Sequence, residues 1–232
     1  MIILGLDALD VNMAEKFACR ELMQLEYGRT DISEFDLEKT VILWASFLTG
    51  TNMQSMVKGD LWSFKLKPED TFFRFFKSYK TINVPALSLK QSNHEKERKL
   101  LAGFFKDENS IEEYDSAVWK HHEENKVEFF NSIDEPYSIM VYFDLADAIG
   151  HLSFGDVEKM GFAYKELNEI AKEVKKSRDD VTLIVSDHGM KAIGRFGDHT
   201  RTGFWSCNKR LGLKNPRITD FFKILEEFGD EK

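Results

Sequence analysis

The stretch DDVTLIVSDHGM, residues 179–190, contains a short apolar run that ends in charged side chains. The run 181–185 is rich in β-branched residues, which predicts a buried strand. An adjacent acid and imidazole, Asp187 and His188, follow it, and then a glycine. A solvent-facing turn uses such residues, and so does a metal site. The local sequence leaves both interpretations open.

Two further apolar runs predict buried strands. They are MIILGL, residues 1–6, and YSIMVYFDL, residues 137–145. A fourth strand is predicted at 81–89, where Pro85 places it near the edge of a sheet or ends it early.

Helical patterns lie between these strands. Apolar residues recur at helical spacing over 10–25, with Asp10 as a candidate N-cap, and again after Asp156 and over 218–228. The charged stretch 91–126 suits exposed helices. Strands separated by long helices predict a layered α/β fold with a mainly parallel central sheet.

The composition narrows the class of protein. The chain has 232 residues, of which 42% are hydrophobic and 31% charged, as expected for one folded domain. A net charge of −8 argues against a nucleic-acid partner, and no apolar run is long enough to cross a bilayer. The N-terminus lacks a basic leader, so we expect a cytoplasmic protein that does not associate with membranes. Two cysteines are too few for a disulfide framework.

Three acidic residues follow three of the predicted strands. They are Asp7, Asp147 and Asp187. The carboxyl ends of parallel strands share one edge of a sheet, so these carboxylates are expected to lie close together there. Unpaired, they would raise each other's pKa, and a cation resolves that conflict.

Histidines accompany these acids, but each has an ordinary interpretation. His151 follows Asp147 by four residues, which suits two ligands on one helical turn or a helix cap beside an incidental histidine. His199 lies in a Gly-rich loop, where a histidine is commonly exposed. We expect the remaining histidines to lie on solvated helix faces without binding metal: His94, His121 and His122.

Thr40 precedes an apolar stretch, TVILWASFLTG, which predicts a buried helix. As an N-cap it would only stabilise that helix. The same place also suits catalysis, because a helix N-terminus offers free N–H groups to a phosphate, and a metal-activated threonine hydroxyl can attack phosphorus.

The order of these features along the chain resembles the alkaline phosphatase superfamily, and most of all its type I phosphodiesterase/nucleotide pyrophosphatase branch. The stretches that carry the resemblance span almost the full length: GLDALD (5–10), TVILWASFLTG (40–50), YFDLADAIGHLSFG (142–155), VSDHGM (185–190) and GDHTRTGFW (197–205). It implies a single domain over 1–232, with helices on both faces of the sheet. A small cap within 58–135 is the room left for covering the substrate; its aromatic residues either line a pocket or pack.

The resemblance also implies two divalent metal ions. Mixed imidazole and carboxylate ligands favour Zn²⁺, with Mn²⁺ or Fe²⁺ as alternatives. The implied ligands form two groups: Asp147, His151 and His199 for one ion, and Asp7, Asp187 and His188 for the other. Thr40 would be the nucleophile and would also contact metal.

One position departs from the pattern of the branch. Its nucleotide-cleaving members have an asparagine three residues after the nucleophile, and here that place holds Leu43. Phosphate contacts are therefore assigned to Lys39, to the backbone N–H of Val41 and to Asn52. The change bears on a nucleotide substrate more than on phosphoester chemistry.

The function implied is a metal-dependent phosphoesterase. We expect a phosphodiesterase or pyrophosphatase that hydrolyses a small organic phosphate through a phosphothreonine intermediate. A phosphomonoesterase or phosphoglycerate-mutase-like phosphotransferase would use the same site, and a non-catalytic metal-binding descendant is a further alternative. The sequence does not address the oligomeric state.

Overall fold

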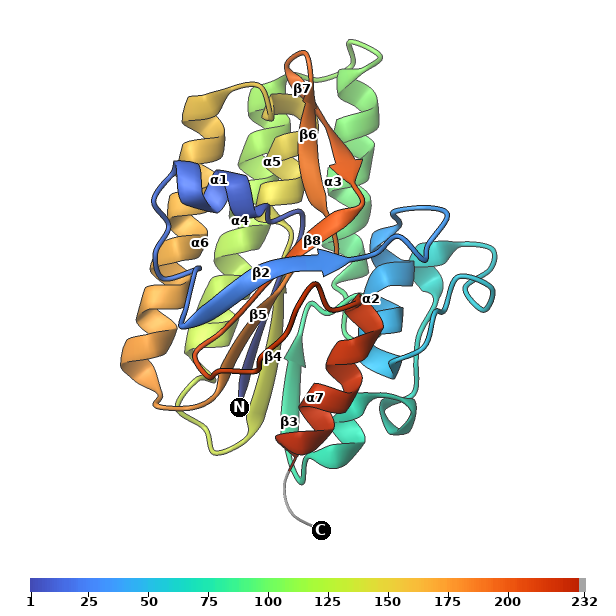
Figure 1. Ribbon diagram of the computed structural model, residues 1–232. Helices are drawn as coiled ribbons and strands as arrows, with labels where there is room; N and C mark the ends of the chain where they lie inside the picture. The colour runs from blue at the N-terminus through green and yellow to red at the C-terminus, as the bar shows by residue number, and fades with distance from the viewer. Residues whose placement is uncertain (230–232) are drawn as a thin grey trace.

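A six-stranded sheet forms the centre of the protein in a computed structural model that describes residues 1–229 (Figure 1). Its strand order is β2-β8-β5-β1-β4-β3. The strands are β1 (Ile2–Leu6), β2 (Glu26–Asp31), β3 (Tyr79–Ile82), β4 (Ser138–Phe143), β5 (Thr182–Val185) and β8 (Thr202–Cys207). β3, β4, β1 and β5 pair in parallel, whereas β8 is antiparallel to both β5 and β2. The predicted mainly parallel sheet is confirmed.

Helices cover both faces of this sheet, as predicted. They are α1 (Val11–Lys16), α2 (Thr40–Thr49), α3 (Gln91–Phe104), α4 (Ile111–Phe130), α5 (Leu145–Ser153), α6 (Val157–Ser177) and α7 (Phe221–Glu227). Figure 1 shows α4, α5 and α6 on one side of the sheet, and α2 and α7 on the other.

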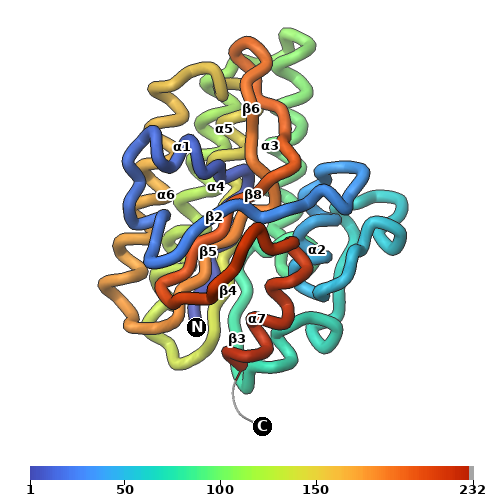
Figure 2. Tube along the Cα trace, viewed as in Figure 1, coloured from blue at the N-terminus to red at the C-terminus, as the bar shows by residue number. Residues whose placement is uncertain are grey.

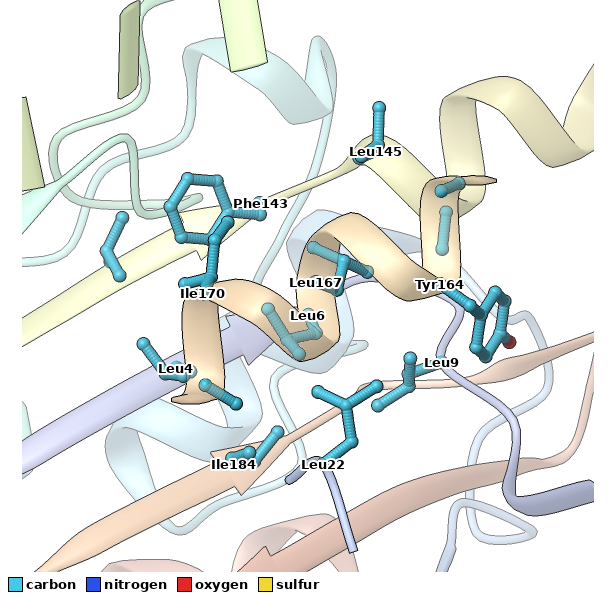
Figure 3. Close-up of a cluster of buried hydrophobic side chains, with 14 of the residues drawn as sticks. Leu4, Leu6, Leu9, Leu22, Phe143, Leu145, Tyr164, Leu167, Ile170 and Ile184 are labelled. Atoms are coloured by element: carbon cyan, nitrogen blue, oxygen red, sulfur yellow. The ribbon is translucent and has the colours of Figure 1, made fainter. Parts of the chain in front are cut away.

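Alternation along the strands divides the core into two clusters, because successive side chains point to opposite faces. Leu4 and Leu6 of β1 pack with Leu167 and Ile170 of α6 (Figure 3). Ile3, between them, joins the cluster that contains α2 and α7. Both faces of the strands are therefore apolar, which explains why the sequence shows continuous apolar runs instead of alternation.

The buried helix α2 packs closely against β1. A Cβ atom at Gly5 would lie 2.8 Å from Cη2 of Trp44, so only glycine leaves room for this indole. The helix ends at Gly50, whose φ of 68° is the left-handed conformation that glycine adopts without strain. This packing holds the N-terminus of α2 at the edge of the sheet where β1 ends.

Most of the predicted Gly-rich loop, residues 194–205, lies in two strands, which corrects the sequence interpretation. Residues 202–207 form β8 inside the sheet, and residues 196–200 form β7, which pairs with β6 (Gly189–Ile193) in a separate hairpin. A Cβ atom at Gly203 would lie 2.2 Å from the backbone oxygen of Ser186, so glycine is what allows β8 to approach the end of β5. β2 was not predicted either.

Several predicted boundaries are confirmed and others are wrong. Asp10 caps α1 through its side chain, as predicted. α6 begins directly after Asp156, as predicted, and the side chain of Asp156 caps it. However, α1 ends at Lys16 instead of continuing to residue 25, and Ala18 has a φ of 53°. β3 stops at Ile82 and is an edge strand, as expected from the nearby proline. No helix among residues 1–229 has the length and apolarity needed to cross a membrane.

The prediction that the histidines of α4 are solvated is wrong. His122 is 1% exposed and its ring lies 5.1 Å from that of Phe143, while His121 is 6% exposed. His94 on α3 is half-buried, with its ring centroid 3.6 Å from that of Trp62. These histidines are buried because α4 packs between the sheet and α3, although its sequence is strongly charged.

Candidate active site

Three predicted acids meet at the carboxyl edge of the parallel strands. Asp7 directly follows β1 and Asp187 follows β5 by two residues. Asp147 lies in the first turn of α5, which begins just after β4. Because β1, β4 and β5 are adjacent and parallel, their ends bring the three carboxylates together, as predicted.

The first ligand group combines Asp147, His151 and His199. One ligand atom from each lies within 4.8 Å of the others. His151 Nε2 is 3.2 Å from one oxygen of Asp147, and His199 Nε2 is 3.3 Å from the other. Asp147 and His151 share one face of α5 at i and i+4.

His199 reaches this group through the β6–β7 hairpin, which runs beside α5 (Figure 2). In the register of the hairpin, His199 of β7 pairs with Met190 of β6, and β6 directly follows His188. The hairpin therefore brings the segment of His199 beside the segment of His188. A Cβ atom at Gly197 would lie 2.7 Å from the backbone oxygen of Gly150. Glycine at 197 thus lets the hairpin approach the helix closely enough to place the imidazole.

The second group combines Asp7, Asp187 and His188, and all three are at most 1% exposed. His188 Nε2 lies 3.2 Å from Asp7 Oδ1 and 3.6 Å from Asp187 Oδ2. The hydroxyl of Tyr142 on β4 donates a hydrogen bond to the other oxygen of Asp7. The two groups adjoin, since the rings of His188 and His199 stack with centroids 3.8 Å apart.

Backbone carbonyls determine which imidazole nitrogens face the site. His188 Nδ1 lies 3.1 Å from the oxygen of Gly189, and His199 Nδ1 lies 3.0 Å from that of Glu38. A carbonyl oxygen only accepts hydrogen bonds, so Nδ1 carries the proton in both rings. Each Nε2 therefore faces the carboxylates and would offer its lone pair to a metal ion bound between them, which is the arrangement of a metal-ligating histidine.

Many of these polar atoms are buried without a hydrogen-bond partner, within the part of the chain that the structure describes. The atoms are Asp7 Oδ1, Asp147 Oδ1, both carboxylate oxygens of Asp187, His188 Nε2 and His199 Nε2. Buried polar groups are nearly always hydrogen-bonded, so a convergent set of unpartnered ones needs a ligand. Carboxylate oxygens and imidazole nitrogens are the donors that Zn²⁺ and similar ions take, and the site therefore fits the implied metals.

The pKa values of the acids also show that buried carboxylates crowd together here without a bound cation. Burial, followed by the charge of Asp147, raises the pKa of Asp7, and burial with the charge of Asp7 raises that of Asp187 well above its ordinary value. Burial opposes ionisation of Asp147 too, but the charge of His151 and the contacts of both imidazoles hold its pKa well below the usual range. Against the opposing effect of burial, Asp147 raises the pKa of His199 to about 9.

Thr40 opens onto the same site. It is the first residue of α2, and the N-cap position is Lys39, whose side chain makes no cap hydrogen bond. Thr40 is therefore a helical residue and not the N-cap considered from the sequence. A cavity of about 330 Å³ is lined by Thr40, Lys39 and Val41 and by the first ligand group together with Asp7.

Asn52 is the predicted phosphate contact that the structure places elsewhere. It lies beyond the C-terminal end of α2, roughly 15 Å along a ten-residue helix from Thr40. Its side chain donates to the oxygen of Glu34 and accepts from the N–H of Gln54. It does not line the cavity.

The cavity also has a wall that the sequence interpretation missed. Trp62, His94, Glu97 and Arg98 come from the segment 58–135. Two further lining residues are Tyr142 and Asp144, and these stand in the YFDLAD stretch, where Asp144 directly follows the strand. The position of Asp144 directly after a strand could have predicted from the sequence that it lines the site. No local pattern shows that a charged helix such as α3 forms a cavity wall.

Comparison with known proteins places this arrangement among known folds. No protein-family model matches the chain, and no curated protein sequence matches it. Among solved structures, the 2-O GAG sulfatase BT1596 is 10% identical, with a TM-score of 0.55 over 98% of this chain and 70% of that chain. Murine ectonucleotide pyrophosphatase/phosphodiesterase 5 is 12% identical, with a TM-score of 0.46 over 84% of this chain. An inactive variant of the murine protein in complex with AMP gives a TM-score of 0.45.

The chain spans 58% of the length of these murine structures. The match to the sulfatase covers nearly the whole chain, and at this low identity it concerns the fold alone. The chain therefore has the α/β fold of the alkaline phosphatase superfamily.

Proposed function

We propose that the chain is a metal-dependent phosphoesterase that cleaves small phosphodiesters or pyrophosphates. One observation carries the proposal: two groups of metal-ligating side chains adjoin each other, and Thr40 lines the cavity into which the first of them opens. All seven positions implied by the resemblance hold suitable residues, and this favours an enzyme over a non-catalytic binding protein.

The proposed metal ligands are Asp147, His151 and His199 for one ion and Asp7, Asp187 and His188 for the other. When bound, such a pair supplies Lewis acidity and neutralises charge on a phosphoryl group. We propose two divalent ions, with Zn²⁺ first because the donors are imidazole nitrogens and carboxylate oxygens. Neighbouring groups orient three of these donors, those of His188, His199 and Asp7.

The chain's own residues would divide the remaining work. The Thr40 hydroxyl, held rigidly at the start of a buried helix, would attack phosphorus and give a phosphothreonine intermediate. The N–H of Val41 and the positive end of the α2 dipole would stabilise the phosphoryl oxygens. Lys39, which is exposed and lines the cavity, would attract the substrate anion. Asn52 has no place in this scheme.

Segment 58–135 is proposed as the small cap of a single domain that spans the chain. It supplies Trp62, His94, Glu97 and Arg98 to the cavity wall, and this favours a lining role for part of the segment. Its buried phenylalanines, Phe72 and Phe73, instead pack in the core. A cytoplasmic location and a small phosphorylated substrate, without a nucleic-acid partner, stay predictions.

The substrate class is tested with chromogenic esters on Zn²⁺-loaded protein. We expect bis-p-nitrophenyl phosphate to be hydrolysed faster than p-nitrophenyl phosphate, with p-nitrophenyl sulfate unchanged. A preference for the monoester would favour a phosphomonoesterase or phosphotransferase instead. Hydrolysis of the sulfate ester alone would overturn the phosphoesterase proposal.

The nucleophile is tested with two substitutions at one position. Thr40→Ala should reduce hydrolysis by at least about 1000-fold, because the nucleophile is lost, while bound zinc stays at the parental level. Thr40→Ser keeps a hydroxyl and should retain measurable turnover. Parental activity in the alanine variant would exclude a phosphothreonine intermediate.

A further inference from the structure

A second set of metal-ligating side chains lies on the wall of the cavity, outside the six proposed ligands. His94 and Glu97 project from α3, and Asp144 stands between β4 and α5. One ligand atom from each of the three lies within 4.8 Å of the others. The two residues of α3 share a helix face at i and i+3, so the helix presents both together.

Glu97 is buried, whereas His94 and Asp144 are half-buried, and the three side chains are incompletely paired. Glu97 is 6% exposed, which is rare for a carboxylate. Among residues 1–229, His94 Nε2 is buried without a hydrogen-bond partner. Asp144 occupies the N-cap position of α5, yet its carboxylate makes no cap hydrogen bond and lines the cavity instead. An unpartnered imidazole nitrogen beside two carboxylates offers lone pairs that no group of the protein binds, and a cation would bind them.

Neighbouring residues hold the set in place. His121 on α4 approaches Glu97, with its Nδ1 2.5 Å from Glu97 Oε1, and thereby orients this carboxyl. Trp62 packs on the His94 ring and fixes its direction. Such supporting contacts around potential ligands are typical of metal sites.

The protonation states follow from the same surroundings. Burial and the charge of Asp144 raise the pKa of Glu97 to about 9, while burial and Arg98 lower that of His94 to about 4. His94 is thus a neutral imidazole with an available lone pair. The two carboxyls share a site where, without a cation, one must keep its proton.

We propose that His94, Glu97 and Asp144 form a third divalent-cation site, for Zn²⁺ or Mn²⁺. One nitrogen and two oxygen donors suit these ions, and the cavity leaves room for further ligands from water or substrate. Since the same cavity contains Thr40, an ion here would bind an anionic group of the substrate beyond the reacting phosphorus. The site itself uses none of the six ligands of the proposed pair.

The proposal is tested by counting bound zinc. The full chain is stripped with a chelator, dialysed against Zn²⁺ and analysed by elemental mass spectrometry, and each equivalent is titrated against a chromogenic competitor. Parental protein should bind three equivalents, and His94→Ala and Glu97→Gln should each bind two. Glu95→Gln is the matched control, since Glu95 is an exposed carboxylate on the same helix, and this variant should bind three.

The outcomes separate this proposal from the proposed function. Two equivalents in parental protein, with phosphodiesterase activity intact, would overturn the third site alone. A third equivalent that persists in both His94→Ala and Glu97→Gln would likewise overturn it, because the ion would then bind elsewhere. Fewer than two equivalents would contradict the metal pair. If Glu97→Gln fails to fold, the half-buried His94 still decides the question through His94→Ala.

Discussion

Replacing Asp187 by asparagine should change protein stability in opposite directions with and without metal. Asp187 is fully buried, and neither carboxylate oxygen has a hydrogen-bond partner within residues 1–229. In metal-free protein this group is a cost, because burial and the charge of Asp7 disfavour its ionised form. In metal-loaded protein the same carboxylate is a ligand. The substitution therefore removes the cost of burying a carboxylate from the metal-free protein and removes a metal ligand from the metal-loaded protein.

The magnitudes follow from the burial. An unsatisfied buried polar group costs about 1–3 kcal/mol, and a neutral amide is cheaper to bury than a carboxylate. A chain of this length shifts its Tm by roughly 2–4 °C per kcal/mol, so the metal-free Asp187→Asn variant should melt roughly 2–12 °C higher than the parent. Metal at 100 times its Kd stabilises by about 2.7 kcal/mol, and losing that binding should lower the Tm by roughly 5–10 °C.

The assay is a thermal melt of both proteins with chelator and with excess Zn²⁺. Asp134→Asn serves as the control, because Asp134 is exposed and the same substitution there should leave the Tm unchanged under both conditions. Equal destabilisation of the Asp187 variant in both conditions would refute the reasoning. Asp187 would then be a structural group and not a metal ligand.

Two further predictions concern the same centre. The pKa of His199 is about 9 in the folded protein, above its ordinary value of 6.5. Its contribution to the free energy of unfolding is therefore complete below pH 6.5 and is lost as the pH rises through about 9. Metal-free protein should accordingly lose on the order of 1–3 kcal/mol of stability to urea across that window, and a flat profile would contradict the His199–Asp147 contact. Tyr142→Phe removes the hydrogen bond to Asp7 and should weaken zinc binding about 10–100-fold in a competitive titration. Tyr27→Phe, at an exposed tyrosine, should have no such effect.

Several candidate ligands could be placed from the sequence, because their positions depend only on the end of a strand or on a helical turn. Asp7 and Asp187 follow apolar runs that are unambiguous in the sequence. The i, i+4 spacing of Asp147 and His151 needs only that their segment be helical. In parallel strands these local positions translate directly into proximity, since the carboxyl ends must lie along one edge.

Other features depended on contacts between distant segments. The pairing of β8 with β5 rests on Gly203, whose lack of a side chain has meaning only beside Ser186. Asn52 follows the predicted helix in the sequence, but the direction of that helix carries it away from the cavity. His199 is placed by a hairpin whose approach to α5 no local pattern reveals.

The sequence by itself determined the apolar strands, the caps of two helices and the order of the acidic and imidazole residues. These follow from short-range periodicity and from side chains that act within a few residues. Only the tertiary structure decided that the charged helix α3 forms a wall of the cavity and that His121 and His122 are buried. The physical reason is that the burial of a side chain depends on the surface against which its helix packs. Hydrogen bonds and ion pairs formed at that surface can compensate for charge that would otherwise keep the helix in water.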